Sequence, residues 1–162
     1  MNVVEDFKNG LKQAFIDLGC ELVGTQGSYE SEVCKIKFNY DFKKLDETLS
    51  YWGLERSEDY FIIRVKDLTH HKLPDLIEAF AEITTEGEDD YGMTAYVPYE
   101  TYSVAYIKET DYKDFAKAII DEIKDVADNP LENLSEPDWT EISINNEQDR
   151  RECAEIARYE DR

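Results

Sequence analysis

The segment 111–128 constrains the fold more than any other part of the chain, because its apolar and acidic residues separate onto different faces of a helix. At about 100° per residue, the apolar residues recur at steps of three and four and fill one side. Six carboxylates fall within a neighbouring arc of about 120°: Asp111, Asp114, Asp121, Glu122, Asp125 and Asp128. The three lysines of the segment fall on a third side, away from the acids. The pattern predicts a helix with one buried face and one acidic face.

The spacing of these carboxylates suggests what the acidic face is for. A helix rises about 1.5 Å per residue, so the row carries one carboxylate per roughly 4–5 Å. Duplex DNA carries one negative charge per about 1.7 Å of axis, or about 3.4 Å along one strand. The match in charge density is partial, but the geometry resembles a row of phosphates. The alternative is an acidic face that serves only solubility.

The charge of the whole chain favours a basic partner. The 162 residues include 38 Asp and Glu against 18 Lys and Arg, which gives a net charge of −20. Residues 86–162 carry −14 of this and residues 1–85 carry −6. Such a surface repels nucleic acid and anionic membranes, so we expect neither as a direct partner. The self-repulsion also exceeds what solubility requires. We therefore expect the chain to bind a basic protein surface.

A second acidic cluster lies in the segment 86–92, which is predicted to be a loop. Its candidate partner-binding residues are Glu88, Asp89, Asp90 and Tyr91. Oxygen ligands of this kind bind hard cations, but the spacing differs from that of an EF-hand loop, and a solvated acidic loop is the simpler interpretation. Tyrosines crowd the region that follows, up to residue 106. They indicate either a protein-binding surface or the core face of a hairpin.

The sequence offers little support for catalysis. It contains no GxGxxG, GxxxxGK[ST], HExxH or GxSxG motif, so we predict no enzyme, no cofactor and no metal site. His70 and His71 are adjacent in a polar segment and are interpreted as an exposed pair. Three cysteines without a CxxC pair indicate buried thiols rather than disulfides or a zinc site. A small His-dependent or metal-dependent enzyme remains an alternative that depends on the histidines meeting an acid or thiol.

The periodicities along the chain predict an α+β fold. Helices are expected at 3–18, 41–53, 73–83, 111–128 and 146–159, and strands at 21–25, 32–40, 60–65, 93–97, 102–107 and 140–144. The order from 60 to 144 is then β-α-β-β-α-β, the split βαβ element of ferredoxin-like folds, preceded by a helix and hairpin and followed by a C-terminal helix. Its two helices are expected to pack one sheet face with Leu76, Phe80, Phe115, Ile119 and Ile123. Residues 1–145 form a single domain, with 146–162 a helix that is either docked or frayed.

These features together predict an inhibitor protein that occupies the nucleic-acid-binding surface of a nuclease or another DNA-handling enzyme. A DNA-mimicking anti-defence protein of a phage or mobile element, of the anti-CRISPR or anti-restriction kind, would have this size and charge. The analogy is with that class of proteins and not with any one member. The alternative is an immunity protein that neutralises a bacterial toxin nuclease. No run of 18 apolar residues and no signal-peptide pattern is present. A cytoplasmic monomer or homodimer is therefore expected, in the host cytosol if a phage encodes it.

Overall fold

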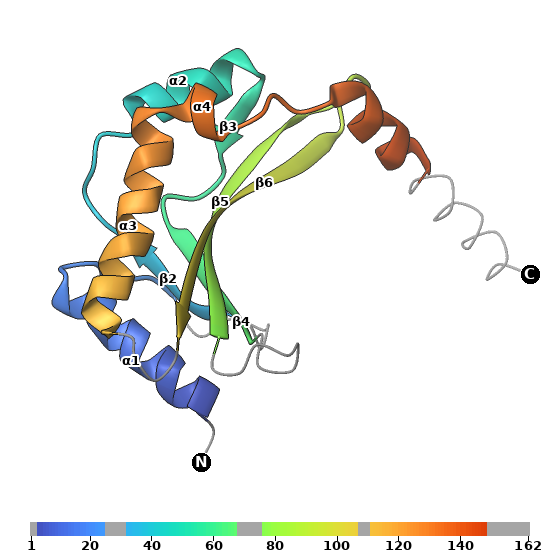
Figure 1. The fold of residues 1–162 in the computed structure, drawn as a ribbon. Helices are drawn as coiled ribbons and strands as arrows, with labels where there is room; N and C mark the ends of the chain where they lie inside the picture. The colour runs from blue at the N-terminus through green and yellow to red at the C-terminus, as the bar shows by residue number, and fades with distance from the viewer. Residues whose placement is uncertain (1–2, 25–31, 68–75, 107–110, 149–162) are drawn as a thin grey trace, which may run out of the picture.

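An antiparallel sheet with helices on one face makes up the structure, which is a computed structural model describing residues 3–24, 32–67, 76–106 and 111–148 (Figure 1). The helices and strands are, in order, α1 Val3–Asp17, β1 Glu21–Leu22, β2 Glu32–Lys37, α2 Lys43–Tyr51, β3 Leu54–Arg56, β4 Phe61–Asp67, β5 Leu76–Glu88, β6 Thr94–Tyr106, α3 Tyr112–Asp128 and α4 Pro130–Asn133. A further helix covers 139–148. The chain is therefore an α+β protein, as the sequence predicts.

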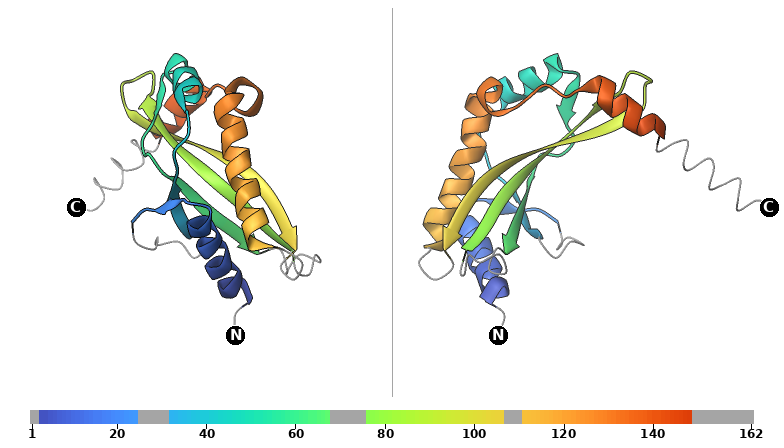
Figure 2. Two further views of the ribbon diagram at one scale, coloured as in Figure 1. Left: turned by 90° about the vertical axis from the view of Figure 1, so that its left-hand side faces the viewer. Right: turned by 45° about the vertical axis from the view of Figure 1, so that its right-hand side comes forward.

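The strand β5 organises the sheet, because it pairs with three others. β4 lies opposite the first half of one β5 edge, from Ile77 to Glu82, and β3 lies opposite the second half, from Thr85 to Gly87. β6 pairs with the whole of the other edge. β2 and β1 extend the sheet beyond β4. Every pairing is antiparallel, and β5 with β6 forms a long twisted hairpin (Figure 2).

The core lies between the inner sheet face and the helices α1, α2 and α3. The rings of Phe7 on α1 and Phe115 on α3 lie 5.8 Å apart between centroids, where the two helices cross the sheet. The largest fully buried side chains come from helices and strands alike: Phe7, Leu11, Phe15, Ile36, Leu45, Leu49, Phe61, Ile63, Ile77, Ile83, Ile119 and Ile123. Each contributes about 1.5–3 kcal/mol by burial, so α3 is firmly held on the sheet.

The prediction of a helix at 73–83 is wrong, since residues 76–88 form the strand β5. The inward positions of β5 alternate along the strand, from Ile77 through Ala79 and Ala81 to Ile83, and all four are buried. Leu76 and Phe80, which we expected in the core with α3, stand at the intervening, half-buried positions. Alanine has a high helix propensity, and it hides the alternation of a strand because its side chain is small.

The two strands expected at 93–97 and 102–107 are one strand, β6. Pro98 lies in the gap between the two expected strands, where a turn would be needed, but it stands opposite Thr84 within the ladder. Among the described strands only β5 pairs with β6, so β6 is an edge strand, and proline is tolerated where its missing N–H faces away from the ladder.

The strand expected at 140–144 is also wrong, because these residues lie in the helix 139–148. Asp138 starts this helix by accepting a hydrogen bond from the Glu141 N–H at 3.1 Å. The described elements between 60 and 144 thus run β4, β5, β6, α3, α4 and helix 139–148, in place of the β-α-β-β-α-β order that depended on the misassigned segments. Most of the helix predicted at 146–159 lies outside the described residues. The remaining predicted elements are present within a few residues of their expected bounds.

Candidate functional site

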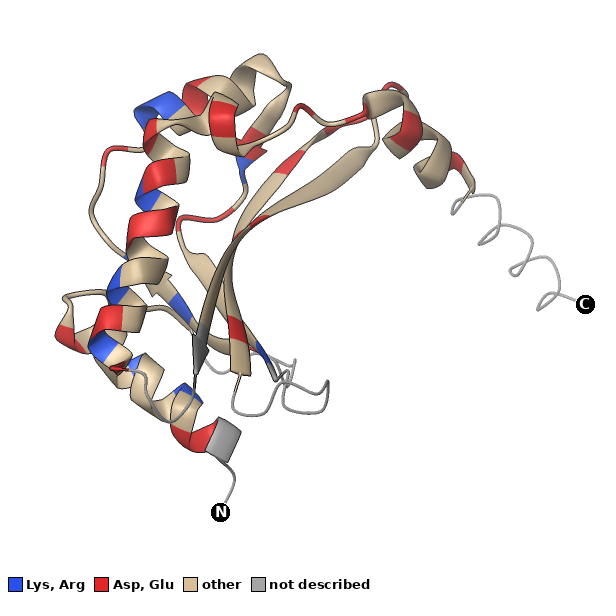
Figure 3. Cartoon of the chain, in the orientation of Figure 1, with Lys and Arg blue, Asp and Glu red and all other residues tan. Residues whose placement is uncertain are grey.

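The acidic face of α3 is formed as the sequence predicts. Its apolar side is buried, including Phe115, Ile119, Ile123 and Val126, and the six predicted carboxylates are all exposed. Red segments recur along α3 in Figure 3. None of the six makes an ion pair within the described part of the chain. We call this set, Asp111, Asp114, Asp121, Glu122, Asp125 and Asp128, the acidic row.

Three members of the acidic row also have local roles. Asp111 is the N-cap of α3, and its Oδ1 accepts hydrogen bonds from the Lys113 and Asp114 N–H groups at 2.9 and 3.1 Å. Asp125 accepts a hydrogen bond from the Asn129 side-chain amide. Asp128 accepts one from the Tyr40 hydroxyl at 2.7 Å, which raises the Tyr40 pKa. Asp114, Asp121 and Glu122 have no such bond to another described residue, so their charges are available to a partner.

The second predicted cluster is divided, because Asp89 is turned into the fold and the other three residues stay at the surface. Asp89 is buried, and its carboxylate accepts hydrogen bonds from the Tyr91 and Met93 N–H groups and from the Asn146 side chain. It closes the turn between β5 and β6 and ties this turn to helix 139–148. Glu88, Asp90 and Tyr91 are exposed, and Tyr91 retains 65% of its surface. The Asp90 N–H donates to the buried Ser143 Oγ.

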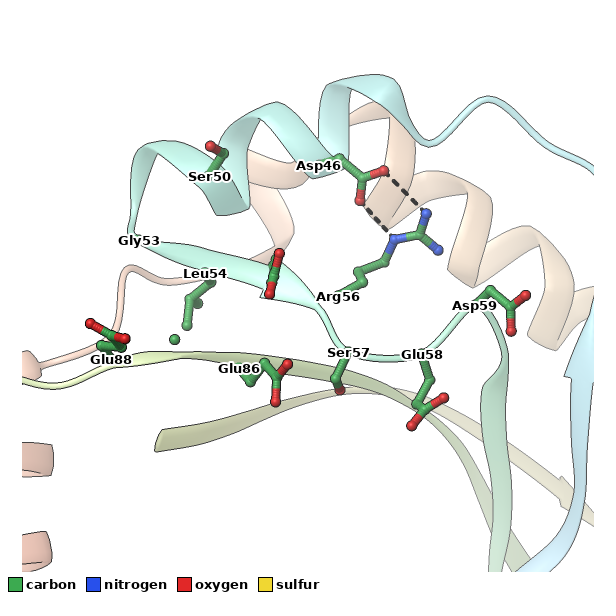
Figure 4. A pocket seen from close by; sticks show the side chains of 12 residues that line it. Asp46, Ser50, Gly53, Leu54, Arg56, Ser57, Glu58, Asp59, Glu86 and Glu88 are labelled. Atoms are coloured by element: carbon green, nitrogen blue, oxygen red, sulfur yellow. Dashed lines mark hydrogen bonds and ion pairs between the residues drawn. The ribbon is translucent and has the colours of Figure 1, made fainter. Parts of the chain in front are cut away.

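An acidic groove of about 1110 Å³ lies between α2, β3 and the end of β5 (Figure 4). Its six carboxylates come from segments far apart in the sequence, so spacing along the chain gave no sign of it: Asp46, Glu55, Glu58, Asp59, Glu86 and Glu88. Among the described residues that line it, the one cation is Arg56, whose guanidinium binds both carboxylate oxygens of Asp46, at 2.7 and 3.1 Å. Lys37 pairs with Asp59 at 2.8 Å and lowers the Asp59 pKa. The remaining four carboxylates are in no ion pair within the described segments.

The tyrosines of β6 divide between the two faces of the sheet. Tyr96 and Tyr102 point away from the helices and retain 68% and 59% of their surface. Tyr99 points inward, and its hydroxyl donates to the Ser135 carbonyl. Burial raises the Tyr99 pKa. We call the outward side of the hairpin the open sheet face, which includes Phe80, Glu82, Glu86, Tyr96, Glu100, Tyr102 and Val104.

The described residues include two buried thiols and no cluster of metal-ligating side chains. Cys20 and Cys34 are buried free thiols, and burial raises the Cys34 pKa to about 12, so this thiol is a poor nucleophile. His70, His71 and Cys153 lie outside the described residues. Within the described ranges no group of three or more metal-ligating side chains is arranged to hold an ion. The described helices include none that is long and apolar enough to cross a membrane.

Comparison with protein-family models, with curated proteins and with solved structures finds no match to this chain. Any assignment of function therefore rests on the surfaces described above.

Proposed function

We propose that the chain is an inhibitor that binds a basic, nucleic-acid-binding surface of a nuclease or another DNA-handling enzyme. The observation that carries the proposal is the acidic row of α3, whose six exposed carboxylates have no cation paired with them among the described residues. The inhibitor needs no chemistry of its own, because occlusion of the partner's surface is sufficient.

The physical basis is that lysines and arginines that hold phosphates attract any surface with a similar row of negative charge. The electrostatic field of a chain with a net charge of −20 steers it toward such a surface and accelerates association. α3 is also rigid, because Phe115, Ile119 and Ile123 hold it on the sheet. Its charges are therefore positioned before binding, which lowers the entropic cost of association. The class of anti-CRISPR and anti-restriction proteins, acting in the cytosol of a bacterial host, fits this description.

The test replaces Asp121, Asp125 and Asp128 together by Asn. The amide oxygen of Asn keeps the acceptors used by Tyr40 and Asn129, so the fold is retained while three charges are lost. The wild-type chain and the variant are each titrated into a CRISPR effector nuclease with its guide RNA, and into a type I restriction enzyme, with labelled duplex DNA as the competitor. We expect the wild-type chain to displace DNA from one of them and the variant to do so at least about tenfold less well.

A matched control separates the acidic row from net charge. Asp6→Asn, Glu47→Gln and Glu132→Gln also remove three exposed charges, but from α1, α2 and α4. We expect this control to inhibit nearly as well as wild type and the α3 variant to show a shallower fall in affinity from 50 to 200 mM salt. Equal losses in the two variants, or simultaneous binding of DNA and the chain to one enzyme, would contradict the proposal.

The alternative, an immunity protein against one toxin nuclease, is favoured by the aromatic and acidic open sheet face. A cognate pair uses a localised patch with aromatic anchors rather than a long charged row. An immunity protein binds a single toxin tightly at 150 mM salt and leaves unrelated nucleases active. If variants at Tyr96 and Tyr102 abolish inhibition while the α3 variant retains it, this alternative replaces the first.

A further inference from the structure

We propose that the open sheet face binds an arginine-rich segment of a partner protein. The face lies on the opposite side of the sheet from α3, so it is a second interaction surface. It shares with the proposed function only the basic character of the partner, and the two can fail separately.

The helices α1, α2, α3 and α4 leave this face uncovered. They all pack against the other side of the sheet, as Figures 1 and 2 show. The outward residues of β5 are half-buried or exposed, whereas the inward ones are buried. Tyr96, Tyr102 and Val104 on β6 retain 68%, 59% and 59% of their surface. A surface with this much exposed aromatic and aliphatic area, close to carboxylates, is typical of a protein interface.

Carboxylates of neighbouring strands stand directly opposite one another on this face. Glu82 on β5 is the register partner of Glu100 on β6. Like charges at directly opposite positions are destabilising, because their Cβ atoms lie only about 4.5–5.5 Å apart. Arg64 reaches Glu82 from β4, at 3.7 Å, whereas Glu100 accepts a hydrogen bond from the Tyr102 hydroxyl, at 2.8 Å, and is in no ion pair within the described residues. A cation supplied by a partner would relieve the repulsion.

The same arrangement recurs along the hairpin. Glu55 on β3 stands directly opposite Glu86 on β5, and Glu86 stands directly opposite Tyr96 on β6. Glu55 and Glu86 also line the acidic groove, so the groove opens onto this part of the face. Each of the two exposed tyrosines therefore lies next to a pair of opposed carboxylates, Tyr102 beside Glu82 and Glu100, and Tyr96 beside Glu55 and Glu86.

Elsewhere in the chain, an arginine already lies between an aromatic ring and a carboxylate. Arg56 lies over the Phe42 ring, 4.7 Å from its centroid, while its guanidinium binds Asp46 through two nitrogens. Stacking on a ring and bidentate bonding to a carboxylate are the combination that arginine makes better than lysine. The rings of Tyr96 and Tyr102 have no described cation over them, so the open sheet face presents two such places for arginines of a partner.

The spacing of the two tyrosines sets the size of the segment. Tyr96 and Tyr102 are six residues apart in one strand, about 20 Å at about 3.3 Å per residue. An extended peptide of nine residues reaches about 30 Å, enough to contact both.

The experiment measures binding of fluorescein-labelled nona-arginine and nona-lysine to the full chain by fluorescence anisotropy at 150 mM salt. The two peptides carry equal charge, so a difference between them reports stacking and bidentate bonding. We expect nona-arginine to bind about fivefold to about thirtyfold more tightly. The variant Tyr96→Leu with Tyr102→Leu keeps apolar bulk on the strand, and we expect it to lose most of this preference. The control is Tyr51→Leu on α2, since Tyr51 is 89% exposed on another element, and it should bind as wild type does.

A second variant keeps the proposal testable if the first perturbs the strand. Glu100→Gln removes one of two opposed charges, so we expect it to raise Tm by about 1–3 °C. The same variant should weaken nona-arginine binding at least about threefold. A variant that is more stable but binds nona-arginine more weakly would indicate a repulsion that a partner relieves. If Glu100 had only a structural role, the variant would change stability and leave binding unchanged.

Three results would overturn the proposal. One is equal affinity for the two peptides in the wild-type chain. Another is loss of nona-arginine binding in the α3 variant Asp121→Asn, Asp125→Asn, Asp128→Asn but not in the tyrosine variant. The third is a wild-type dimer that the tyrosine variant converts to a monomer in sedimentation, because a second copy of the chain would then occupy the face. None of these results decides whether α3 inhibits a nuclease, and failure of the nuclease test leaves the peptide result intact.

Discussion

At the scale of single residues, buried polar groups join the distant parts of the fold. The Trp139 indole N–H donates to the Trp52 carbonyl at 3.0 Å, which ties helix 139–148 to the end of α2. Asp89, Ser143 and Asn146 join the same helix to the β5–β6 turn. The sequence suggested Asp89 as a partner-binding acid, because residue type alone does not show whether a carboxylate is buried or exposed. Its partner Asn146 is 57 residues away, and a contact at that separation leaves no local signal.

Gly87 is predicted to be one of the least replaceable residues. A Cβ at this position would overlap the Gly53 carbonyl oxygen and lie 2.9 Å from the Trp139 ring. We expect Gly87→Ala to lower the free energy of unfolding by about 2 kcal/mol or more, because backbone and a packed indole must both move. Urea unfolding measures the effect. The neighbouring exposed Glu88→Ala should change stability by less than about 0.5 kcal/mol; equal effects would mean that the end of the hairpin is loosely packed.

At the scale of elements, helices with marked amphipathic faces were predictable and long strands were not. α3 combines an N-cap, a buried apolar face and an acidic face, and these signals agree with one another. β5 has outward Phe80 and inward Ala79 and Ala81, so its large apolar residues fall at spacings that also suit a helix. Pairing with β4, β3 and β6 decides the outcome, and those partners come from three other parts of the chain. Likewise Pro98 resembles a turn residue until the edge position of β6 is known.

The N-cap of α3 provides a test of whether the hydrogen bonds or the charge of Asp111 stabilise the helix. Asp111→Ala removes the acceptor for the Lys113 and Asp114 N–H groups, and we expect it to lower the free energy of unfolding by about 0.5–2 kcal/mol. Asp111→Asn keeps an acceptor of similar capping strength and should cost much less. Thermal and urea unfolding distinguish the two. If both variants lose stability equally, the negative charge at the helix N-terminus matters more than the hydrogen bonds.

At the scale of the whole molecule, the two sides of the sheet present different kinds of side chains to a partner. The helical side presents the acidic row, and the opposite side presents rings among opposed carboxylates. The net charge and the acidic row were predictable from the sequence, because composition and helical periodicity determine them. The tyrosine-rich region was recognisable too, but the sequence left open which of its tyrosines face outward. The acidic groove was not predictable. Both depend on cross-strand register between segments separated by loops.

The net charge of −20 gives the last prediction, because salt should act in opposite directions on folding and on binding. Raising NaCl from 10 to 500 mM shortens the Debye length from about 30 Å to less than about 8 Å and screens repulsion within the chain. We expect Tm to rise by about 3–6 °C, on the order of 1–2 kcal/mol. The four ion pairs of the described residues oppose this only weakly, since such pairs contribute little near the surface.

Affinity for a basic partner should fall over the same salt range, because the same charges then attract less strongly. The variant Asp121→Asn, Asp125→Asn, Asp128→Asn should show a smaller rise in Tm and a shallower loss of affinity, since it carries three charges fewer. Differential scanning calorimetry and anisotropy on the same samples measure both. A Tm that falls with salt would contradict the prediction, because it would show that attractive pairs outweigh repulsion in the folded chain.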